Sequence, residues 1–210
     1  MKKICIHQPY AVPPYRGYYR LFEKTDLAVL LDDAQFTRRG FMHRNRLRLA
    51  DGRLDWFTLP LKKAPQETLI KDMRFADDAY ERIQEQMRRF PCFQRLPDDL
   101  RLNIECAHGG FAEYAHRILA LTARHLGIKT SFVQSQFSLV PRDMPAADRL
   151  IALCKHFGAD SLLNAPGGVK LYDPAYFAER GVKLEFLPAW DGPVDSVLEL
   201  IAAQQERVAA

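Results

Sequence analysis

The chain opens with two short apolar runs, at residues 4–6 and 27–31, and each run ends abruptly in polar residues. Between them, residues 15–24 carry apolar side chains at roughly helical spacing, so the pattern predicts a strand, a helix and a second, parallel strand with a right-handed crossover. The polar residues that follow the runs are His7 and Gln8 after the first, and Asp32, Asp33 and Gln35 after the second. Because ligands of open α/β sheets bind outside the carboxyl ends of the strands, we expect these side chains to line one cleft.

The rest of the chain continues to alternate between strand-like and helical patterns. Further strands are predicted at residues 68–75, 128–133, 160–163 and 182–186, and further helices at residues 79–90, 97–104, 111–126, 146–157, 174–180 and 194–208. The Asp51-Gly52 pair between two apolar stretches is typical of a β-hairpin.

Together these elements predict a single α/β domain over residues 1–210. Its centre is a mainly parallel, Rossmann-like sheet of about five strands with helices on both faces. A β-hairpin insertion is expected near residues 40–75, and a helical segment near residues 77–127.

A proline-rich loop follows the first strand and carries the candidate residues His7, Gln8 and Tyr10. Prolines fix φ and hold the residues before them extended, so the loop is stiff enough to aim these side chains. An imidazole with a pKa near 6.5 can accept a proton close to neutrality, which makes His7 the candidate general base. Asp32 or Asp33 would orient His7 or hold a divalent cation against phosphates, and the sequence leaves these roles, and the identity of any cofactor, open.

Two segments of the chain resemble the signatures of a known family. The first reads HQPY-x(2)-PPYRGYY-x-LF-x(3)-D-x-AVLLDDAQF-x(8)-NR, from His7 to Arg46, and the second reads LLNAPGGVKLYDPAYFAERGVKLEFL, from Leu162 to Leu187. Both resemble the WbqC-like family, which is found among bacterial surface-polysaccharide gene products. The resemblance implies a role in O-antigen or related glycoconjugate pathways, and members of the family are described as transferases.

The first signature ends at Asn45 and Arg46, which we expect to bind substrate. They lie within a short basic cluster whose members are Arg38, Arg39, His43, Arg44, Arg46 and Arg48. Interleaved aromatic residues could suit nucleic acid, but the cluster is short and the 26 acidic residues of the chain nearly balance its 30 basic ones. We therefore expect recognition of a phosphate or a sugar acid rather than of nucleic acid, and the alternative is a solvated basic face without a ligand.

The second signature adds candidate substrate-binding residues at Asn164, Gly167, Gly168 and Tyr172. Asn164 follows a predicted strand, and the two glycines lie between that strand and a predicted helix. Backbone N–H groups of such a loop can approach an anion, and the dipole of the helix favours negative charge there. The loop is therefore expected to hold a phosphate at the same edge of the sheet as His7, and the alternative is a glycine turn without a ligand.

The composition of the chain indicates its cellular compartment and limits the partners it can have. Met1-Lys2-Lys3 precedes just three apolar residues, and no apolar run approaches about 18 residues, so we expect a cytoplasmic protein without a membrane partner. The four widely spaced cysteines include no CxxC pair, which favours buried thiols over disulfides or a zinc site. The candidate metal ligands His108, His116 and His125 lack an HExxH motif or a carboxylate cluster, so no metal site is predicted at these histidines.

The leading hypothesis is a transferase that acts on an activated sugar, nucleotide or acyl donor in surface-polysaccharide biosynthesis. A net charge of +4 suits a phosphorylated or nucleotide-linked small molecule. The alternative is a non-catalytic sugar- or nucleotide-binding accessory protein of such a pathway. Neither GxGxxG nor GxxxxGK[ST] occurs, and the layout is similar to the nucleotidyltransferase superfamily in topology alone, because a single His7 stands where that superfamily has an HxGH pair. Donor, acceptor and oligomeric state are left open.

Overall fold

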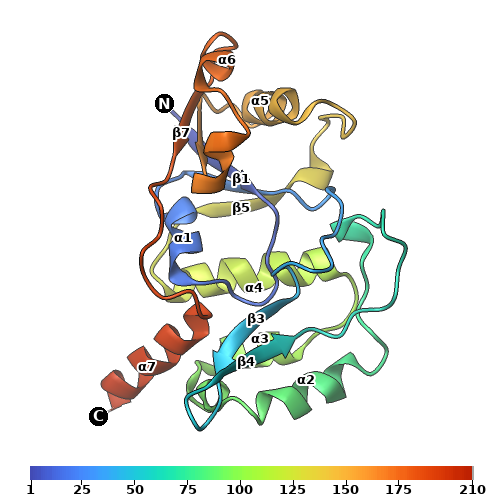
Figure 1. Ribbon diagram of the computed structural model, residues 1–210, viewed down its shortest axis with the longest axis vertical. Coiled ribbons are helices and arrows are strands. Elements are labelled where there is room, and N and C mark those ends of the chain that lie inside the picture. Colours follow the sequence, from blue (N-terminus) through green and yellow to red (C-terminus); the bar gives the residue numbers. More distant parts are fainter. Residues whose placement is uncertain (210) are drawn as a thin grey trace.

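The computed structural model describes the backbone of residues 1–209 and the side chains of residues 1–207, and in this range five parallel strands form one sheet (Figure 1). The strands are β1 (Lys3–His7), β2 (Leu27–Leu30), β5 (Ser131–Gln134), β6 (Ser161–Asn164) and β7 (Lys183–Phe186). Their order across the sheet is β5-β2-β1-β6-β7. The chain therefore leaves β1 toward one side of the sheet and later returns to build the other side, so the direction of winding reverses between β1 and β6.

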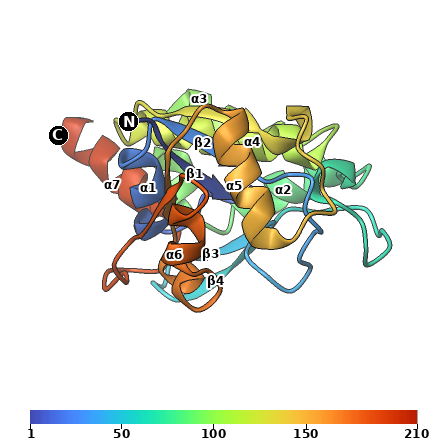
Figure 2. The same ribbon diagram turned by 90° about the horizontal axis from the view of Figure 1, so that it is seen from above.

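Helices cover both faces of this sheet, as the sequence predicts. On one face lie α1 (Arg16–Glu23) and α4 (Phe111–His125), and on the other lie α5 (Ala146–His156) and α6 (Pro174–Ala178) (Figures 1 and 2). Strand β1 contributes to both cores: Ile4 and Ile6 pack with the α5 and α6 side chains, whereas Cys5 packs with those of α1 and α4. A sheet that is buried on both faces explains the uninterrupted apolar runs that mark these strands in the sequence.

The predicted hairpin insertion lies between β2 and β5. It consists of the antiparallel strands β3 (Arg44–Arg48) and β4 (Leu54–Thr58), with Gly52 at φ +83° in the connecting turn. The helical segment that follows contains α2 (Ala79–Met87), the 3₁₀ helix η2 (Pro91–Arg95) and α3 (Asp98–Glu105), and the chain continues into α4. The last helix, α7 (Val197–Ala209), packs against η2 and β3.

Three other short 3₁₀ helices are η1 (Ile70–Asp72), η3 (Ser135–Phe137) and η4 (Pro166–Lys170). The strand predicted at residues 68–75 is wrong: η1 and isolated bridges occupy that segment. Its buried residues Ile70 and Met73 are three apart, the spacing of one 3₁₀ turn, and its Ile70 and Lys71 N–H groups donate to the carbonyls of Ala34 and Asp32. These N–H groups are therefore bonded to the loop after β2 rather than to a neighbouring strand.

Two expectations from composition can be compared with the structure. Cys5, Cys92 and Cys154 are buried free thiols, but Cys106 is exposed because it follows the C-terminus of α3. Among the described residues, no helix combines the length and apolar character that crossing a membrane would require.

Candidate functional site

A cavity of about 630 Å³ opens at the carboxyl edge of the sheet, beside β1 and β6. His7 at the end of β1, residues 165–167 after β6 and residues 187–194 after β7 contribute to its wall, together with α1 and the β3 hairpin. This is the point at which the winding of the sheet reverses, where strand ends and loops diverge and leave a crevice. The fold itself therefore creates the cavity.

Aromatic side chains form much of the lining of this cavity. They are His7, Tyr10, Tyr15, Tyr18, Phe41 and Trp190. In the described part of the chain, no Asp or Glu lines the cavity, and Arg46 is the lining residue that carries a full charge. The cavity therefore suits a ligand with a flat ring or an apolar face and one anionic group.

The orientation of His7 is fixed by its own backbone neighbour. The Nδ1 atom lies 3.0 Å from the carbonyl oxygen of Gln8, which can only accept a hydrogen bond. Nδ1 therefore carries the proton, and Nε2 of the neutral ring keeps its lone pair. Within residues 1–207, the hydrogen bond of the His7 ring is the one at Nδ1, so Nε2 can accept a proton from a molecule in the cavity.

Two tyrosines hold the ring of His7 in place. Tyr10 and Tyr18 stack on each other at 5.1 Å and meet the imidazole edge to face at 5.5 and 5.0 Å. Their rings replace water around the imidazole, and this desolvation lowers the pKa of His7, while the bond to Gln8 acts in the opposite direction. The imidazole is consequently neutral, and able to act as a base, at neutral pH.

The hairpin places Arg46 at the rim of the cavity. Its guanidinium lies 5.9 Å from the ring of Trp56, and its buried Nε has no hydrogen-bond partner among the described residues. Asn45 has a supporting role, because its amide donates to the carbonyl of Pro13 at 2.9 Å and accepts from the N–H of Arg46 at 2.8 Å. Asn45 thus ties the hairpin to the proline-rich loop and leaves Arg46 free to bind a ligand.

The sequence did not single out Tyr15, Tyr18 and Trp190 as residues of the site. Trp190 lies on α1 at Gly17, where a Cβ atom would be 2.5 Å from the indole ring. The sequence did hold a signal for Trp190, because it comes shortly after the last strand of the sheet, just as His7 lies at the end of the first strand. The tyrosines, in contrast, could be read only as the apolar face of a helix.

The expectation that all the polar residues at strand ends line one cleft is wrong. Gln8 and Gln35 lie in a neighbouring cavity of about 790 Å³, which is also lined by Arg38 and Arg39. Successive side chains of an extended strand point to opposite sides, so His7 and Gln8 enter different cavities. The Gln35 amide donates to the carbonyl of Gln66 at 2.8 Å, which directs it away from His7.

Asp32 and Asp33 form a buried network apart from His7. Asp32 accepts hydrogen bonds from the Gln134 amide and the N–H of Gln136, at 2.8 and 3.0 Å, and the Ser135 hydroxyl, whose one proton it shares with Asp33, lies 3.1 Å away. Asp33 accepts from Ser135 at 2.6 Å and pairs with Arg149 of α5 at 2.5 Å. These donors occupy the carboxylates, so they neither orient His7 nor offer the free oxygen atoms that a divalent cation needs.

The two carboxylates have opposite pKa shifts. Burial raises the pKa of Asp32 above its ordinary value despite its hydrogen bonds. Burial also acts to raise the pKa of Asp33, but the hydrogen bond and charge of Arg149 and the bond from Ser135 outweigh it and lower the pKa. Asp33 is therefore the ionised partner of Arg149.

Comparison of the sequence with known proteins identifies the family of this chain. A family model described as the WbqC-like protein family matches residues 8–193, which is most of the chain and includes nearly all of the cavity lining. The chain belongs to the WbqC-like protein family. It is 26% identical over 223 residues to a protein of Mycobacterium tuberculosis described as "Uncharacterized protein Rv1507c", in an alignment that covers 96% of this chain and 93% of the relative. No solved structure matches the chain.

The paired glycines of this WbqC-like protein have different positions. Gly167 lines the cavity, and a Cβ atom there would meet nothing within 4 Å. Gly168 packs against Asn164 instead, where a Cβ would lie 2.9 Å from the amide nitrogen, and its N–H donates to the carbonyl of Ala165. Of the two glycines, only Gly167 can present its backbone to a ligand in the cavity.

The other candidate residues of the second signature, Asn164 and Tyr172, lie outside the cavity lining. The Asn164 amide oxygen accepts from the N–H of Ala165 at 2.7 Å, and Tyr172 packs edge to face on Phe177 at 5.9 Å. The carboxylate of Asp173 caps the first turn of α6 by accepting from the N–H of Ala175 at 2.9 Å. An anion site at the N-terminus of α6 is therefore not formed, because a carboxylate already occupies it.

Two of the three histidines of the helical segment, His116 and His125, contact other side chains. His125 contacts the carboxylate of Asp99 at 2.9 Å, and His116 contacts the side chain of Gln134 at 3.4 Å. Among the described residues, no group of three His, Cys, Asp or Glu side chains is placed to hold a metal ion.

Proposed function

We propose that this WbqC-like protein is a transferase that acts on an activated sugar, nucleotide or acyl donor in bacterial surface-polysaccharide biosynthesis. The observation that supports this most directly is the free Nε2 of a neutral His7, held beside an aromatic cavity at the switch point of the sheet. A ring held by its other nitrogen and kept neutral by desolvation is the arrangement that general-base catalysis requires.

The donor would bind through Arg46 and the aromatic wall. Arg46 offers an unpaired guanidinium, which binds a phosphate or carboxylate by charge-assisted hydrogen bonds. Tyr15, Trp190 and Phe41 provide flat apolar surface for a sugar face or a base. The Gly167 backbone leaves room for the ligand to approach closely.

In the proposed reaction, a hydroxyl or amine of the acceptor attacks the electrophilic carbon or phosphorus of the donor. Nε2 of His7 removes the proton of the acceptor as the new bond forms, and the bond to the leaving group breaks. Arg46 compensates the negative charge on the leaving group. Nδ1 keeps its proton and its hydrogen bond to the carbonyl of Gln8, so the imidazolium that forms is stabilised at its second nitrogen.

The alternative function is a non-catalytic sugar- or nucleotide-binding accessory protein. The same cavity supports it, because aromatic walls and one arginine would bind such a ligand without any reaction. The free base nitrogen of His7 is the feature that a binding protein has no need for, and it favours the transferase.

The test combines binding with turnover. Thermal-shift measurements against nucleotide sugars, nucleotides, coenzyme A thioesters and aminoacyl donors select a ligand, since saturation at a hundred times the Kd stabilises a protein by about 2.7 kcal/mol. The ligand is then titrated calorimetrically into the wild type, His7→Gln and Arg46→Ala. Arg46→Ala should weaken binding by about 1.5 to 3 kcal/mol.

For a transferase, His7→Gln should retain affinity within about tenfold while release of the donor's leaving group in the presence of acceptors is lost. Binding without turnover in the wild type would support the accessory protein. If no donor class binds, or if Arg46→Ala binds like the wild type, the cavity is not the donor site.

A further inference from the structure

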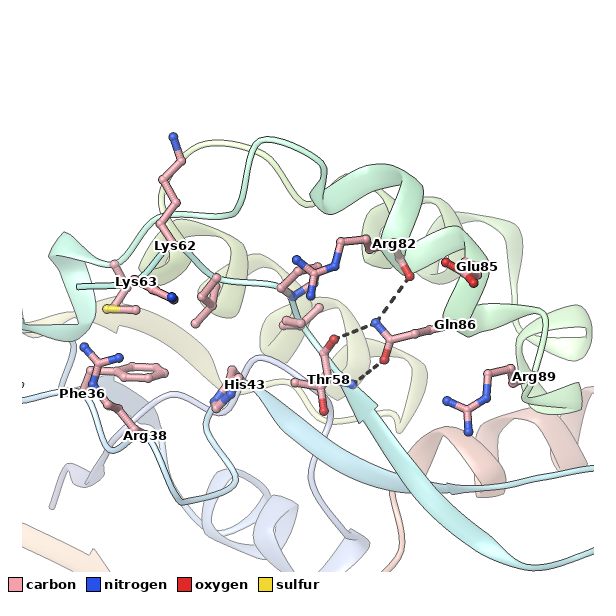
Figure 3. Close-up of a pocket in the computed structure, with 14 residues that line it drawn as sticks. Phe36, Arg38, His43, Thr58, Lys62, Lys63, Arg82, Glu85, Gln86 and Arg89 are labelled. Carbon is pink, nitrogen blue, oxygen red and sulfur yellow. Dashed lines mark hydrogen bonds between the residues drawn. The ribbon is translucent and has the colours of Figure 1, made fainter.

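A second cavity, of about 550 Å³, lies between the hairpin and α2, outside the site already described (Figure 3). Its lining includes five Lys and Arg side chains and one carboxylate, from Glu85. The cationic residues are Arg38, Lys62, Lys63, Arg82 and Arg89. The cavity beside His7 carries one cation, so the two cavities differ in the ligand chemistry they favour.

The cations around this second cavity are only weakly neutralised by the protein. Lys62 and Arg82 pair with Asp77 and Asp78, but those carboxylates are 91% and 65% exposed, so the pairs contribute little. Arg38 donates to the backbone carbonyls of Ala64 and Pro65, which fixes its guanidinium without cancelling its charge.

Figure 3 shows which of these groups face the cavity. The guanidinium of Arg82 and the amino group of Lys63 reach toward its middle, whereas Lys62 points away from it. His43 lies at the floor, and its buried Nδ1 has no hydrogen-bond partner among the described residues. Two effects lower the pKa of His43 to about 4. The larger is desolvation by burial, and the second is the positive charge of Arg44 and Arg38.

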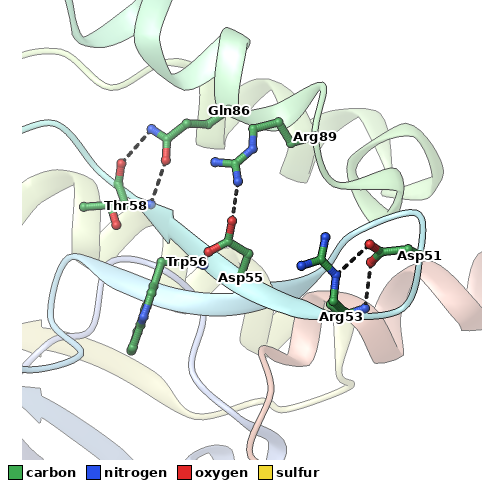
Figure 4. Close-up of polar contacts among 7 residues, drawn as sticks. All are labelled: Asp51, Arg53, Asp55, Trp56, Thr58, Gln86 and Arg89. Atoms are coloured by element: carbon green, nitrogen blue, oxygen red, sulfur yellow. Dashed lines mark hydrogen bonds and ion pairs between the residues drawn. The ribbon is translucent and has the colours of Figure 1, made fainter.

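The walls of the cavity are held by contacts between α2 and the free edge of β4. The Gln86 side chain donates to the carbonyl of Thr58 at 2.8 Å and accepts from its N–H at 3.0 Å, and Arg89 pairs with Asp55 (Figure 4). Gln86 thus completes the hydrogen bonds of an edge strand. The cationic groups consequently surround a cavity whose shape exists before any ligand binds.

We infer that this cavity is a second binding site, for a small molecule that carries two or more phosphate groups. Arg38 and His43 come from the hairpin side, Lys63 from the connection after β4, and Arg82 from α2, so donors converge from separate walls. A single phosphate could contact one wall, whereas a diphosphate can bridge two. The volume is within the range of about 300 to 1,000 Å³ that small-molecule sites occupy.

The site is independent of the proposed transferase activity. The two cavities share no lining residue, although Phe36 and Arg38 also line the intermediate cavity that contains Gln8. A ligand in the second cavity can therefore be tested without knowing the reaction at His7.

The test uses inorganic pyrophosphate as the probe and isothermal titration calorimetry as the measurement. All proteins carry Arg46→Gln, so that the cavity beside His7 does not contribute. In that background, Lys63→Gln with Arg82→Gln removes the two groups that reach into the cavity. The matched control is Lys24→Gln with Lys129→Gln, which removes the same charge from two exposed lysines that line neither cavity.

We expect saturable binding in the Arg46→Gln protein, weakened on the order of tenfold or more by the Lys63 and Arg82 changes and altered less than about twofold in the control. Equal affinity in the two double variants, or no saturable binding in the Arg46→Gln protein, would overturn the inference. The thermal unfolding midpoint of each variant, measured without ligand, shows whether that variant is folded. Should the Lys63 and Arg82 pair fail to fold, Lys63→Gln alone is compared with Lys129→Gln alone, with the same expected direction.

Discussion

His7 and Tyr18 donate to the same acceptor, the carbonyl oxygen of Gln8, at 3.0 and 3.1 Å, while their rings meet edge to face at 5.0 Å. Tyr18 is fixed by α1 and His7 by β1, so this shared carbonyl joins the helix to the end of the strand. The pairing sets both the rotation and the tautomer of the imidazole. The orientation of His7 therefore depends on a contact between β1 and α1.

The first prediction concerns the protonation state of His7. In ¹⁵N-resolved NMR spectra, the ring should be the Nδ1–H tautomer, because only a donor suits the Gln8 carbonyl. Its titration midpoint should lie below about 6.5, because desolvation disfavours the charged form. A His7→Gln protein supplies the assignment. An Nε2–H tautomer, or a midpoint at or above 6.5, would rule out the general-base role as described.

The second prediction concerns the pH dependence of stability through His43. Its pKa is about 4 in the folded protein and near 6.5 in the unfolded chain, so between these values the unfolded chain binds more protons. The free energy of unfolding should therefore decrease as the pH falls from about 6.5 to 4. Urea unfolding of the wild type and His43→Asn across this range measures the contribution, and the variant should show a shallower decrease. If the free energies of unfolding of the two proteins changed in parallel with pH, the contribution of His43 would be contradicted.

The third prediction tests the contact between α1 and Trp190. In Gly17→Ala, the new methyl group would lie 2.5 Å from the indole, so Trp190 must move out of the cavity wall. Alanine favours a helix by about 1 kcal/mol over glycine, yet we expect the variant to be less stable than the wild type because of this overlap. Thermal unfolding and tryptophan fluorescence report stability and displacement.

Gly167→Ala is the matched control for that experiment, because its methyl group would meet nothing within 4 Å. It should unfold within about 0.5 kcal/mol of the wild type. A Gly17→Ala protein that is more stable than the wild type, with unchanged fluorescence, would show that the indole does not rest on Gly17.

The fourth prediction concerns the buried pair of Asp33 and Arg149, whose side chains are each 9% exposed. Arg149→Met should destabilise the fold by about 3 to 5 kcal/mol, because it leaves the Asp33 carboxylate buried without its cation. Asp33→Asn combined with Arg149→Met removes both charges and should recover part of the loss. Urea denaturation measures all the proteins, and a double variant that is less stable than Arg149→Met would show that unpaired charge is not the cause.

Short-range patterns in the sequence determined the elements of this fold. The apolar runs of β1 and β2, the Asp51-Gly52 turn and the helical spacing of α1 are all local signals, and each predicted its element. The segment at residues 68–75 failed because apolar residues three apart in a 3₁₀ turn resemble an imperfect strand alternation. The two signature segments were also sufficient to indicate the family, which the match over residues 8–193 establishes.

Tertiary structure alone decided which polar residues share a site. Asp32 follows a strand end as His7 does, but its neighbour β5 brings Gln134 and Ser135 to it, and α5 brings Arg149 to Asp33 from 116 positions away. In contrast, the order of the strands places β6 and β7 beside His7 and so adds Gly167 and Trp190. Local periodicity gives the end of each strand, whereas strand order and helix packing, which depend on contacts distant in sequence, determine what each strand end meets.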